Sequence, residues 1–506
     1  MPSLGCCPTQ LSPSLHVPLS AVSRPHDPPP SAVDLSTAQR NAIRALLRVA
    51  PVVDELGRRF EEHGGRLALV GGSVRDALLD RLGTDLDFTT SLRPEVVETL
   101  VRGWADAVWD IGRQFGTIGC RKGDAQIEIT TYRQDAYDGT TRKPSVEFGD
   151  SLEGDLARRD FTVNAMAVSI PDHVFIDPYN GVDDLAAGML RTPVEPEVSF
   201  GDDPLRMMRA ARFASQLGFR PTDEVVVAMQ SMADRIEIVS AERVRDELVK
   251  LLLGRYPRVG LTLLVDTGLA DRVLPELPAL RLERDEHHRH KDVYEHSLTV
   301  LEQAIDLEHR LGEGPDLTIR LAALLHDIGK PKTRRFQSDG SVTFHHHDVV
   351  GAKMTRKRMR ALRFAGDLTD DVAKLVELHL RFHGYGTGEW TDSAVRRYVR
   401  DAGDLLGRLH VLTRADCTTR NKRKAQRLRS AYDDLEARID RLEQEEELAS
   451  IRPDLDGNQI MQTLGIGPGR EVGEAYRFLL EQRLEHGPLG DDAARDALLA
   501  WWADRG

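Results

Sequence analysis

The clearest candidates for chemistry in this sequence are two carboxylates separated by one residue. Asp85 and Asp87 alternate with apolar residues, a pattern that predicts a half-buried β-strand. Side chains two residues apart on a strand point to the same face, so the two carboxylates would lie side by side. Glu128, in a second alternating stretch at Gln126–Thr131, could supply a third carboxylate. Such anions repel one another unless a divalent cation lies between them or both are solvated, and oxygen ligands of this kind suit Mg²⁺. Taken alone, an Asp-x-Asp pattern would favour a plain polar strand edge.

A glycine-rich turn precedes the carboxylate pair by about a dozen residues. The run Gly71-Gly72-Ser73 falls between a predicted strand at 67–70 and a predicted helix at 74–82, and Arg75 lies on the first helical turn. Backbone N–H groups at such a strand–helix turn can contact a phosphate. A Gly-Gly turn by itself more often only reverses the chain, but its place beside the carboxylates favours a phosphate site.

The elements that must position these residues divide the chain. At about 150 residues per domain, 506 residues allow roughly three domains. The first 40 residues hold eight of the 25 prolines and predict a disordered tail. Strand patterns, among them Val163–Ser169, continue to near residue 180 and predict a compact α+β unit. Helical patterns then follow over Pro204–Leu217, Asp223–Ala233, Ala241–Leu253, Pro257–Thr267 and Ala425–Ser450.

Composition excludes several classes of protein. The net charge of −13 argues against a uniformly basic binder of nucleic acid. No apolar run approaches the roughly 18 residues that span a bilayer, which excludes a transmembrane enzyme. The four cysteines have neither zinc-ribbon spacing nor a disulfide framework, so a reducing cytoplasm is the expected location.

Five motifs in order carry a resemblance to a known family. They are Gly71–Leu79 followed by Asp85-Leu86-Asp87; Asp155–Ala165; Asp177-Pro178 with Gly181 and Asp183–Leu185; Asp202–Arg209; and Ala241–Val244 through Glu247-Leu248. Over about 180 residues they resemble the motifs of class II tRNA nucleotidyltransferases, the family of CCA-adding enzymes and bacterial poly(A) polymerases. The resemblance implies an α+β fold class, with a small mixed-sheet, polymerase β-like head followed by an all-α body.

The resemblance also implies nucleotidyl transfer by two metal ions, with Mg²⁺ on Asp85 and Asp87. One metal would lower the pKa of the RNA 3′-hydroxyl, and the other would bind the triphosphate. The candidates for catalysis are Asp85, Asp87 and Glu128, and those for nucleotide binding are Gly72, Ser73, Arg75, Arg159, Asp160, Asn164, Asp203, Arg206, Arg209 and Arg212. Arg212 could equally be a snorkelling surface residue of a helix.

The fourth motif has a chemical reading of its own. Asp203 and Arg206 are three residues apart, on one face of a predicted helix start. Cytosine and adenine each present an amino donor beside a ring-nitrogen acceptor, which an Asp acceptor and an Arg donor complement, whereas uracil and guanine clash with the pair. Asp203 before Pro204 is also an ordinary helix N-cap, and we expect it to serve both purposes. The family usually has Glu where this chain has Asp202.

Twelve of the 17 histidines lie between residues 287 and 410. The ordered set comprises His296 on a predicted helix at Val293–Leu307, His326-Asp327 at the end of an apolar helix at Leu317–Leu325, and a distant Asp416. This order resembles the HD superfamily of metal-dependent phosphohydrolases, and His347 and His379 could complete a two-metal set. Imidazole and carboxylate ligands suit Mn, Ni, Co or Zn better than Mg. His345, His346, His287, His288 and His290 are expected to be loop residues.

Two runs of cations contain no acid. The first holds Lys353, Arg356, Lys357, Arg358, Arg360 and Arg363, and the second holds Arg420, Lys422, Arg423, Lys424, Arg427 and Arg429. Such a run is usually a solvated helix face, but two of them in an acidic chain favour contact with an RNA backbone. The ending from Gly457 to Gly469 resembles the family's tail, which grips tRNA by shape rather than sequence.

These observations predict the domain organisation. We expect a disordered tail at 1–40, a nucleotidyltransferase head at 41–185, a helical nucleotide-selecting and RNA-binding neck at 186–285, an HD domain at 286–425 and a helical tRNA-binding region at 426–506. The expected substrates are tRNA, CTP and ATP, the expected cofactors are Mg²⁺ in the head and a transition metal in the HD domain, and neither a membrane nor an obligate protein partner is indicated.

Two rival functions stay open. A bacterial poly(A) polymerase would use the same catalytic motifs on other RNAs, although the HD domain favours CCA addition. A protein of another class, an HD phosphohydrolase with an RNA-binding head, is opposed by the intact Asp85 and Asp87. The family's CC-only members lack a flexible loop between the first two motifs, and the loop here, from Tyr132 to Phe148, looks complete. The resemblance therefore implies that one chain adds C, C and A rather than part of that set.

Overall fold

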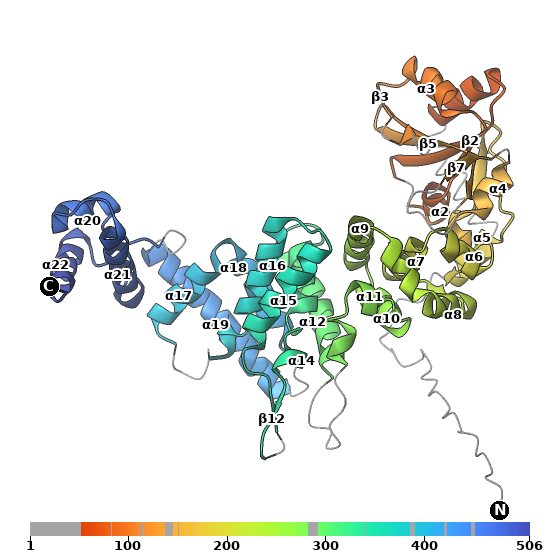
Figure 1. Ribbon diagram of the computed structural model, residues 1–506. Helices are drawn as coiled ribbons and strands as arrows, with labels where there is room; N and C mark the ends of the chain where they lie inside the picture. The colour runs from red at the N-terminus through yellow and green to blue at the C-terminus, as the bar shows by residue number, and fades with distance from the viewer. Residues whose placement is uncertain are drawn as a thin grey trace, which may run out of the picture.

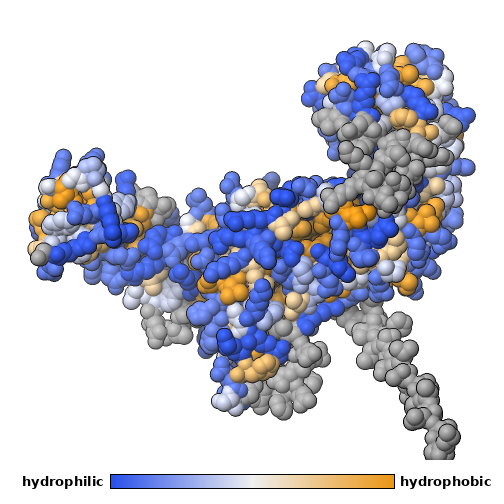
Figure 2. All heavy atoms as spheres, in the orientation of Figure 1, coloured by the Kyte–Doolittle hydropathy of each residue, from blue (hydrophilic) through white to orange (hydrophobic). Residues whose placement is uncertain are grey.

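The computed structural model describes residues 52–81, 83–110, 112–113, 116–136, 145–149, 151–281, 292–339, 341–384, 390–418, 422–446 and 451–505. Within these ranges the chain is elongated, with a sheet-containing head at one end and a small helical unit at the other (Figure 1). Figure 2 shows a mostly hydrophilic surface on this face of the molecule. No helix in the described ranges is both long and apolar enough to cross a membrane. The predicted tail at 1–40 lies outside the described residues.

The head contains a seven-stranded mixed sheet in the order β3-β4-β5-β2-β1-β8-β9. The strands are β3 (Ala107–Trp109), β4 (Thr117–Lys122), β5 (Ala125–Thr131), β2 (Asp85–Thr90), β1 (Leu67–Val70), β8 (Ala167–Ile170) and β9 (Phe175–Ile176). Only β2 and β5 run parallel. Along β2, Leu86 and Phe88 are buried while Asp85 and Asp87 are exposed, which confirms the alternation predicted from the sequence.

Helices and turns complete the head around this sheet. They are a helix over residues 52–62, α2 (Gly72–Leu78), α3 (Pro94–Arg102), α4 (Leu152–Ala157), η2 (Thr162–Asn164) and α5 (Gly181–Ala187), with β6 (Arg133–Ala136) paired to β7 (Ser145–Phe148). The prediction of a strand starting at Val163 is wrong. A 3-10 turn occupies 162–164 because the Thr162 hydroxyl donates to Asp184 of α5 (2.7 Å) and Asn164 turns back to Asp160. The strand begins four residues later, at Ala167.

The neck is almost entirely helical, as its sequence predicts. It comprises β10 (Met189–Leu190), α6 (Pro196–Asp202), α7 (Leu205–Leu217), β11 (Arg220–Pro221), α8 (Asp223–Ser231), η3 (Ala233–Ile238), α9 (Ala241–Leu252), α10 (Pro257–Asp266), α11 (Ala270–Val273) and η4 (Pro278–Leu280). The Ser240 hydroxyl accepts the N–H of Arg243 and fixes where α9 begins. Helix α9 lies between α7 and the helices of the body (Figure 1).

The body continues with helices that surround the histidine cluster. They are α12 (Val293–Leu307), η5 (Glu308–Arg310), α13 (Leu317–Leu325), α14 (Lys330–Thr333), the paired strands β12 (Arg335–Phe336) and β13 (Val342–Thr343), α15 (His347–Ala361), α16 (Gly366–Leu378), η6 (Arg381–Gly384), α17 (Asp392–Ala402), η7 (Gly403–Leu405) and α18 (Leu406–Ala415). The long helix α19 (Lys422–Glu446) follows. Helices α20 (Gly457–Leu464), α21 (Arg470–His486) and α22 (Asp491–Ala503) close around a separate small core.

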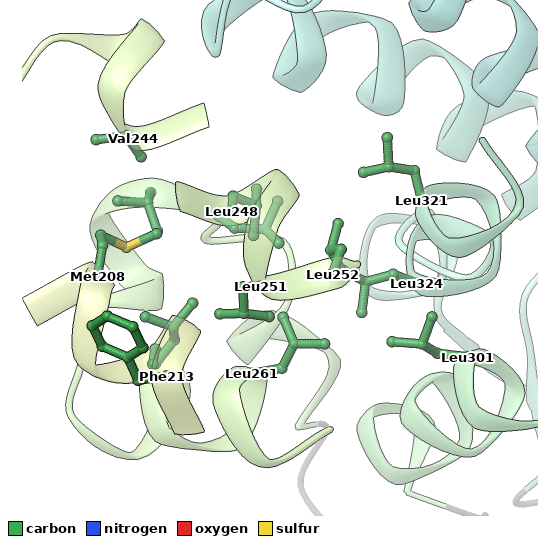
Figure 3. Close-up of a cluster of buried hydrophobic side chains, with 14 of the residues drawn as sticks. Met208, Phe213, Val244, Leu248, Leu251, Leu252, Leu261, Leu301, Leu321 and Leu324 are labelled. Carbon is green, nitrogen blue, oxygen red and sulfur yellow. The ribbon is translucent and has the colours of Figure 1, made fainter. Parts of the chain in front are cut away.

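Apolar packing and one buried arginine join the neck to the body. Leu248, Leu251 and Leu252 of α9 face Leu321 and Leu324 of α13 across a cluster of buried side chains (Figure 3). The Arg320 guanidinium donates to the carbonyl oxygens of Leu252 (2.6 Å) and Gly254 (2.9 Å), satisfying groups that the end of α9 leaves without helical partners. Glu308 binds the same guanidinium at 2.7 Å, so the buried cation is paired.

Candidate functional site

A cleft of about 1260 Å³ opens where the head sheet meets α7 and α9. Twelve of the thirteen residues predicted for catalysis and nucleotide binding line it: Gly72, Arg75, Asp85, Asp87, Glu128, Arg159, Asp160, Asn164, Asp203, Arg206, Arg209 and Arg212. Ser73 does not line the cleft. Residues that are 140 positions apart in sequence therefore share one cavity, as expected of a single active site.

Three carboxylates lie at one wall of the cleft. The parallel pairing of β2 with β5 places Asp87 directly opposite Glu128, and Asp85 is two residues before Asp87 on the same face. Partial loss of water around its carboxylate inside the cleft raises the pKa of Asp87, which Asp85 raises further and Arg159 lowers. The same partial desolvation and the two aspartates raise the pKa of Glu128. Crowded carboxylates that repel one another fit a divalent cation, which would relieve that repulsion.

Ser73 holds the strand that carries these carboxylates. Its hydroxyl accepts a hydrogen bond from the backbone N–H of Asp87 (2.9 Å) and donates to the Asp85 carbonyl (3.4 Å). The side chain is 5% exposed, so it contacts β2 and not the cavity. This geometry assigns Ser73 a positioning contact, whereas its direct contact with nucleotide stays a prediction.

The glycine turn brings backbone and cations together. Gly71 has φ +69°, a conformation that favours glycine, and a Cβ there would lie 2.8 Å from Nη1 of Arg159. Arg159 and Arg158 are in turn held by the buried carboxylate of Asp155, at 3.2 Å and 2.7 Å. The absence of a side chain at Gly71 therefore leaves the space that the Arg159 guanidinium occupies near Asp87.

A chain of polar contacts crosses the cleft floor. Arg75 donates to Asn164 (2.7 Å), Asn164 donates to Asp160 (2.9 Å), and Nε of Arg209 donates to Asp160 (2.7 Å). Burial opposes ionisation of Asp160, but Arg209 and Asn164 hold the pKa of its carboxyl well below the usual range. The network therefore holds the side chains of Arg75 and Arg209 in fixed positions in the cavity, in addition to what their helices α2 and α7 determine.

Arg212 is buried, so the alternative that it is a snorkelling surface residue is wrong. The residue is 8% exposed, its guanidinium lies 4.2 Å from the ring centroid of Phe213, and it pairs with Glu247 of α9 at 3.2 Å. Burial and the nearby Arg209 lower its pKa to about 10, with Glu247 acting in the opposite direction. A buried cation facing a cavity suits an anionic ligand.

Asp203 and Arg206 occupy the far wall, each already oriented by the protein. One Asp203 carboxylate oxygen accepts the N–H of Leu205 (3.1 Å) and the other accepts Arg243 (2.7 Å). Arg206 donates to the Ser199 hydroxyl (2.8 Å) and to the carbonyl of Arg158. Asp203 thus accepts the N–H of the first residue of α7, next to the N-cap Pro204, and also lines the cleft, whereas its contact with a base stays a prediction.

Sequence reasoning missed Arg243, Lys250 and Arg133, which also line the cleft. Arg243 and Lys250 are seven residues, about two turns, apart along α9, and both line the cavity. The fifth motif, which begins at Ala241, was the available signal for Arg243 and Glu247. Their pairing with Asp203 and Arg212 requires the folded contact between α7 and α9, which no local pattern reveals.

A second site lies in the body, where both oxygens of Asp327 face histidines. Oδ2 lies 3.2 Å from Nε2 of His326 and 3.6 Å from Nε2 of His296. Oδ1 lies 3.3 Å from Nε2 of His347 and 4.0 Å from Nε2 of His379. Asp416 adds a carboxylate oxygen 2.9 Å from His296. Five of the six predicted ligands therefore form two groups that share Asp327, and Asp416 contacts His296 of the first group.

The ring orientations of these histidines fit a metal centre. Nδ1 of His326, His347 and His379 lies 2.6–2.8 Å from backbone carbonyl oxygens, which assigns the proton to Nδ1 and leaves the Nε2 lone pair free to ligate. The three Nε2 atoms are buried without a hydrogen-bond partner in the described residues. Burial lowers the pKa of His379 to about 4, which favours its neutral, ligating form. Buried lone pairs directed at a shared carboxylate are what a cation would satisfy.

The basic runs are less free than their sequence indicates. Arg358 binds Glu276 of the neck through two hydrogen bonds (2.8 and 3.1 Å), and Arg356 pairs with Asp370 (3.2 Å). Lys353 and Lys357 are exposed on α15. Arg423 is exposed on α19, and the side chains of Lys422 and Lys424 lie outside the described residues. Contact of these residues with RNA stays a prediction.

The remaining histidines divide between the surface and the undescribed part of the chain. His345 and His346 are exposed before α15, as predicted for loop residues. His287, His288 and His290 lie outside the described residues.

Comparisons with known proteins agree with both sites. Family models match the poly A polymerase head domain at residues 67–191, a probable RNA and SrmB-binding site of polymerase A at 218–280, and the HD domain at 293–421. The chain is 33% identical over 444 residues to the A-adding tRNA nucleotidyltransferase of Deinococcus radiodurans, covering 86% of this chain and 95% of that protein. It is also 33% identical over 441 residues to the CC-adding tRNA nucleotidyltransferase of Thermus thermophilus, covering 86% and 93%.

The fold is that of a solved relative as well. The structure of the Bacillus stearothermophilus CCA-adding enzyme in complex with CTP aligns with a TM-score of 0.65 at 24% identity, covering 91% of this chain and 98% of that one. A mixed-sheet head on a helical body with a carboxylate cleft defines a nucleotidyltransferase that uses divalent metal. The chain belongs to the tRNA nucleotidyltransferase family, with an HD domain in its body.

Proposed function

We propose that this protein adds C, C and A in turn to the 3′ end of tRNA, taking CTP and ATP as substrates and Mg²⁺ as the cofactor of the head. The observation that carries the proposal is that Asp85, Asp87 and Glu128 line the same cleft as Asp203 and Arg206. The two full-length relatives named above are an A-adding and a CC-adding enzyme at equal identity, so overall likeness favours neither half of the reaction. The loop from Tyr132 to Phe148, whose central residues 137–144 lie outside the described residues, supports addition of all three nucleotides.

The residues of the cleft divide the work of nucleotidyl transfer. Asp85, Asp87 and Glu128 would hold the divalent cations, which supply positive charge at the RNA 3′-oxygen and the triphosphate. Arg75, Arg159 and Arg209 are fixed by carboxylates and Asn164, so they would contact phosphate oxygens without first having to be ordered.

Base selection falls to the opposite wall. Each carboxylate oxygen of Asp203 has a second lone pair beyond those used by Leu205 and Arg243, and one of these would accept the amino group of cytosine or adenine. Arg206 would donate to the neighbouring ring nitrogen. A carbonyl at the amino position, as in uracil or guanine, would meet a carboxylate and be rejected.

For the body we propose a phosphohydrolase centre that acts on RNA ends with Mn, Ni, Co or Zn. Three buried Nε2 atoms and two carboxylates form an N/O ligand set that suits such metals better than Mg²⁺. Asp327 and Asp416, whose carboxyl pKa values are held low by adjacent histidines against the effect of burial, would remain ionised as ligands.

Paired variants test the two assignments separately. Asp85→Ala or Asp87→Ala should abolish nucleotide addition and leave hydrolysis by the HD domain intact, because each carboxylate lies in the head cleft only. The double variant His326→Ala, Asp327→Ala should do the reverse. More than a few per cent of extension activity in both head variants would refute the first assignment. A wild type without transition metal, and without hydrolysis when Mn or Ni is supplied, would refute the second.

A further inference from the structure

A short hairpin projects from the body on the side away from the head (Figure 1). It is formed by β12 and β13, with Arg335 opposite Thr343 and Phe336 opposite Val342. Gln337 ties its strands together through the Ser341 carbonyl (2.8 Å) and the Thr343 hydroxyl (3.0 Å). The described part of the hairpin is therefore held in shape by its own hydrogen bonds.

The hairpin presents an aromatic ring and cations to solvent. Phe336 is 69% exposed, the largest value among the exposed large hydrophobic residues in the described ranges. The Arg334 guanidinium lies 4.6 Å from its ring centroid, and Arg335 and Lys332 are exposed beside it. Within the described chain, no carboxylate lies in ion-pair distance of Lys332, Arg334 or Arg335. Unpaired cations around an exposed ring, in a chain of net charge −13, mark a surface for a polyanion with aromatic groups.

The base of the hairpin is built into the histidine centre. Lys330, one turn before β12, binds Oδ2 of Asp327 at 2.5 Å and lies 5.8 Å from the ring of Phe344. The carbonyl of Phe344 is the hydrogen-bond partner that orients the ring of His347 (2.7 Å). Gly329 packs so closely on this segment that a Cβ would lie 2.1 Å from the His347 carbonyl. The two ends of the hairpin therefore contact two ligands of the centre, Asp327 through Lys330 and His347 through Phe344.

We propose that the described part of this hairpin, residues 332–339 and 341–344, binds the single-stranded end of an RNA and directs its terminal phosphate to the Asp327 centre. A base would stack on Phe336, because every base has a face that stacks on an aromatic ring, while Arg334 and Arg335 contact the adjacent phosphates. This surface lies on the other side of the body from the head, so it receives an RNA end separately from the nucleotide cleft. The inference deepens the proposed phosphohydrolase function. Binding of the RNA end does not depend on that function, but hydrolysis of the bound end does.

The first test is binding by the full-length chain. A fluorescein-labelled six-nucleotide RNA with a 3′-phosphate is titrated in the presence of saturating tRNA, so that the surface used for tRNA is filled. Phe336→Ala should weaken binding roughly tenfold, as base stacking predicts, and Phe336→Trp should retain it. Arg334→Gln with Arg335→Gln should reduce the slope of log affinity against log salt by about 1.4, at about 0.7 per phosphate contact on a single strand. Val174→Ala, at a residue 54% exposed just before β9 of the head, is the matched control and should bind like wild type.

The second test is hydrolysis of the same RNA by the manganese-loaded protein, which separates this inference from the proposed function. The Phe336→Ala change should raise KM for the RNA with little change in kcat, because it removes binding rather than chemistry. Tight binding that depends on Phe336, without any hydrolysis, would uphold the RNA surface and refute the phosphohydrolase. Hydrolysis with the same KM in wild type and Phe336→Ala, or equal affinity of these two proteins for the RNA, would overturn the RNA surface.

Discussion

Replacement of Asp203 by Asn tests how the cleft selects bases. The structure predicts that the fold survives, because the asparagine carbonyl can still accept the N–H of Leu205 that Asp203 accepts at 3.1 Å. The other oxygen becomes an amino donor, so the hydrogen bond to the amino group of cytosine or adenine is lost. A hydrogen bond to a charged group contributes about 1.5–3 kcal/mol, which corresponds to a loss of roughly 10- to 150-fold in kcat/KM for CTP and ATP.

The same change should relax the rejection of uracil. An amino donor complements the carbonyl that UTP presents at that position, so the ratio of CTP to UTP incorporation should fall by more than the loss with CTP alone. The assay is extension of a tRNA lacking its last three nucleotides, with kcat/KM measured for each triphosphate. Arg243→Ala is the matched control. Its ion pair with Asp203 is half-exposed and contributes about 0.2–1 kcal/mol, so selection should change by less than about fivefold. An Asp203→Asn protein with wild-type kcat/KM and wild-type discrimination would refute the reasoning.

Three further predictions follow from the same structure. Asp160→Asn should destabilise the head by about 1.5–3 kcal/mol at pH 7, because the partly exposed Arg209 loses its nearest carboxylate and keeps Glu247 at 4.0 Å. Since the folded pKa of Asp160 is depressed, wild type holds this stability above about pH 4 and loses it as the pH falls further, so denaturant midpoints of the two proteins should converge at low pH. His379→Ala should lower the content of bound transition metal from about two ions per chain toward one, because only the Oδ1 side of Asp327 loses a ligand. Mass spectrometry of the purified protein measures this content. An unchanged metal content would contradict the sharing of Asp327 between two ligand groups. Deleting Ala136–Arg142 should stop synthesis after the second C, whereas equal slowing of C and A addition would exclude a role for the loop in switching to A.

Local patterns in the sequence predicted the elements of the site well. The alternation around Asp85 and Asp87 reflects burial of one face of β2, and the apolar spacing from Val293 to Leu307 matches α12 at both ends. These patterns are local because a strand or helix buries one face with a fixed period. Glu128 was also found this way, although its place opposite Asp87 depends on parallel pairing of strands about 40 residues apart.

Contacts between distant elements were beyond sequence reasoning. The basic run from Lys353 to Arg363 contains no acid, yet Glu276 of the neck neutralises Arg358 in the folded chain. Arg212 resembles a surface arginine until α9 brings Glu247 against it. Ser73 follows a glycine pair typical of phosphate sites, but its hydroxyl faces the backbone of β2. In each case the partner comes from another element, and its identity is set by tertiary packing.

The division of Asp327 between two histidine groups could be predicted only in part. The order of the ligands indicated a metal set, whereas the assignment of His326 to one carboxylate oxygen and His347 to the other depends on how α13 and α15 cross. Gly329 permits that crossing, because any side chain there would collide with the backbone at His347.

The measurement that tests the central claim most directly is extension of a tRNA that lacks its 3′-terminal CCA by the purified protein, with CTP and ATP supplied together and the products resolved at single-nucleotide resolution. The account predicts addition of three nucleotides, in the order C, C and A, followed by a stop. A ladder of A residues would identify a poly(A) polymerase instead. A stop after the second C, or addition of A only to a tRNA already ending in CC, would contradict the claim that one chain completes the sequence.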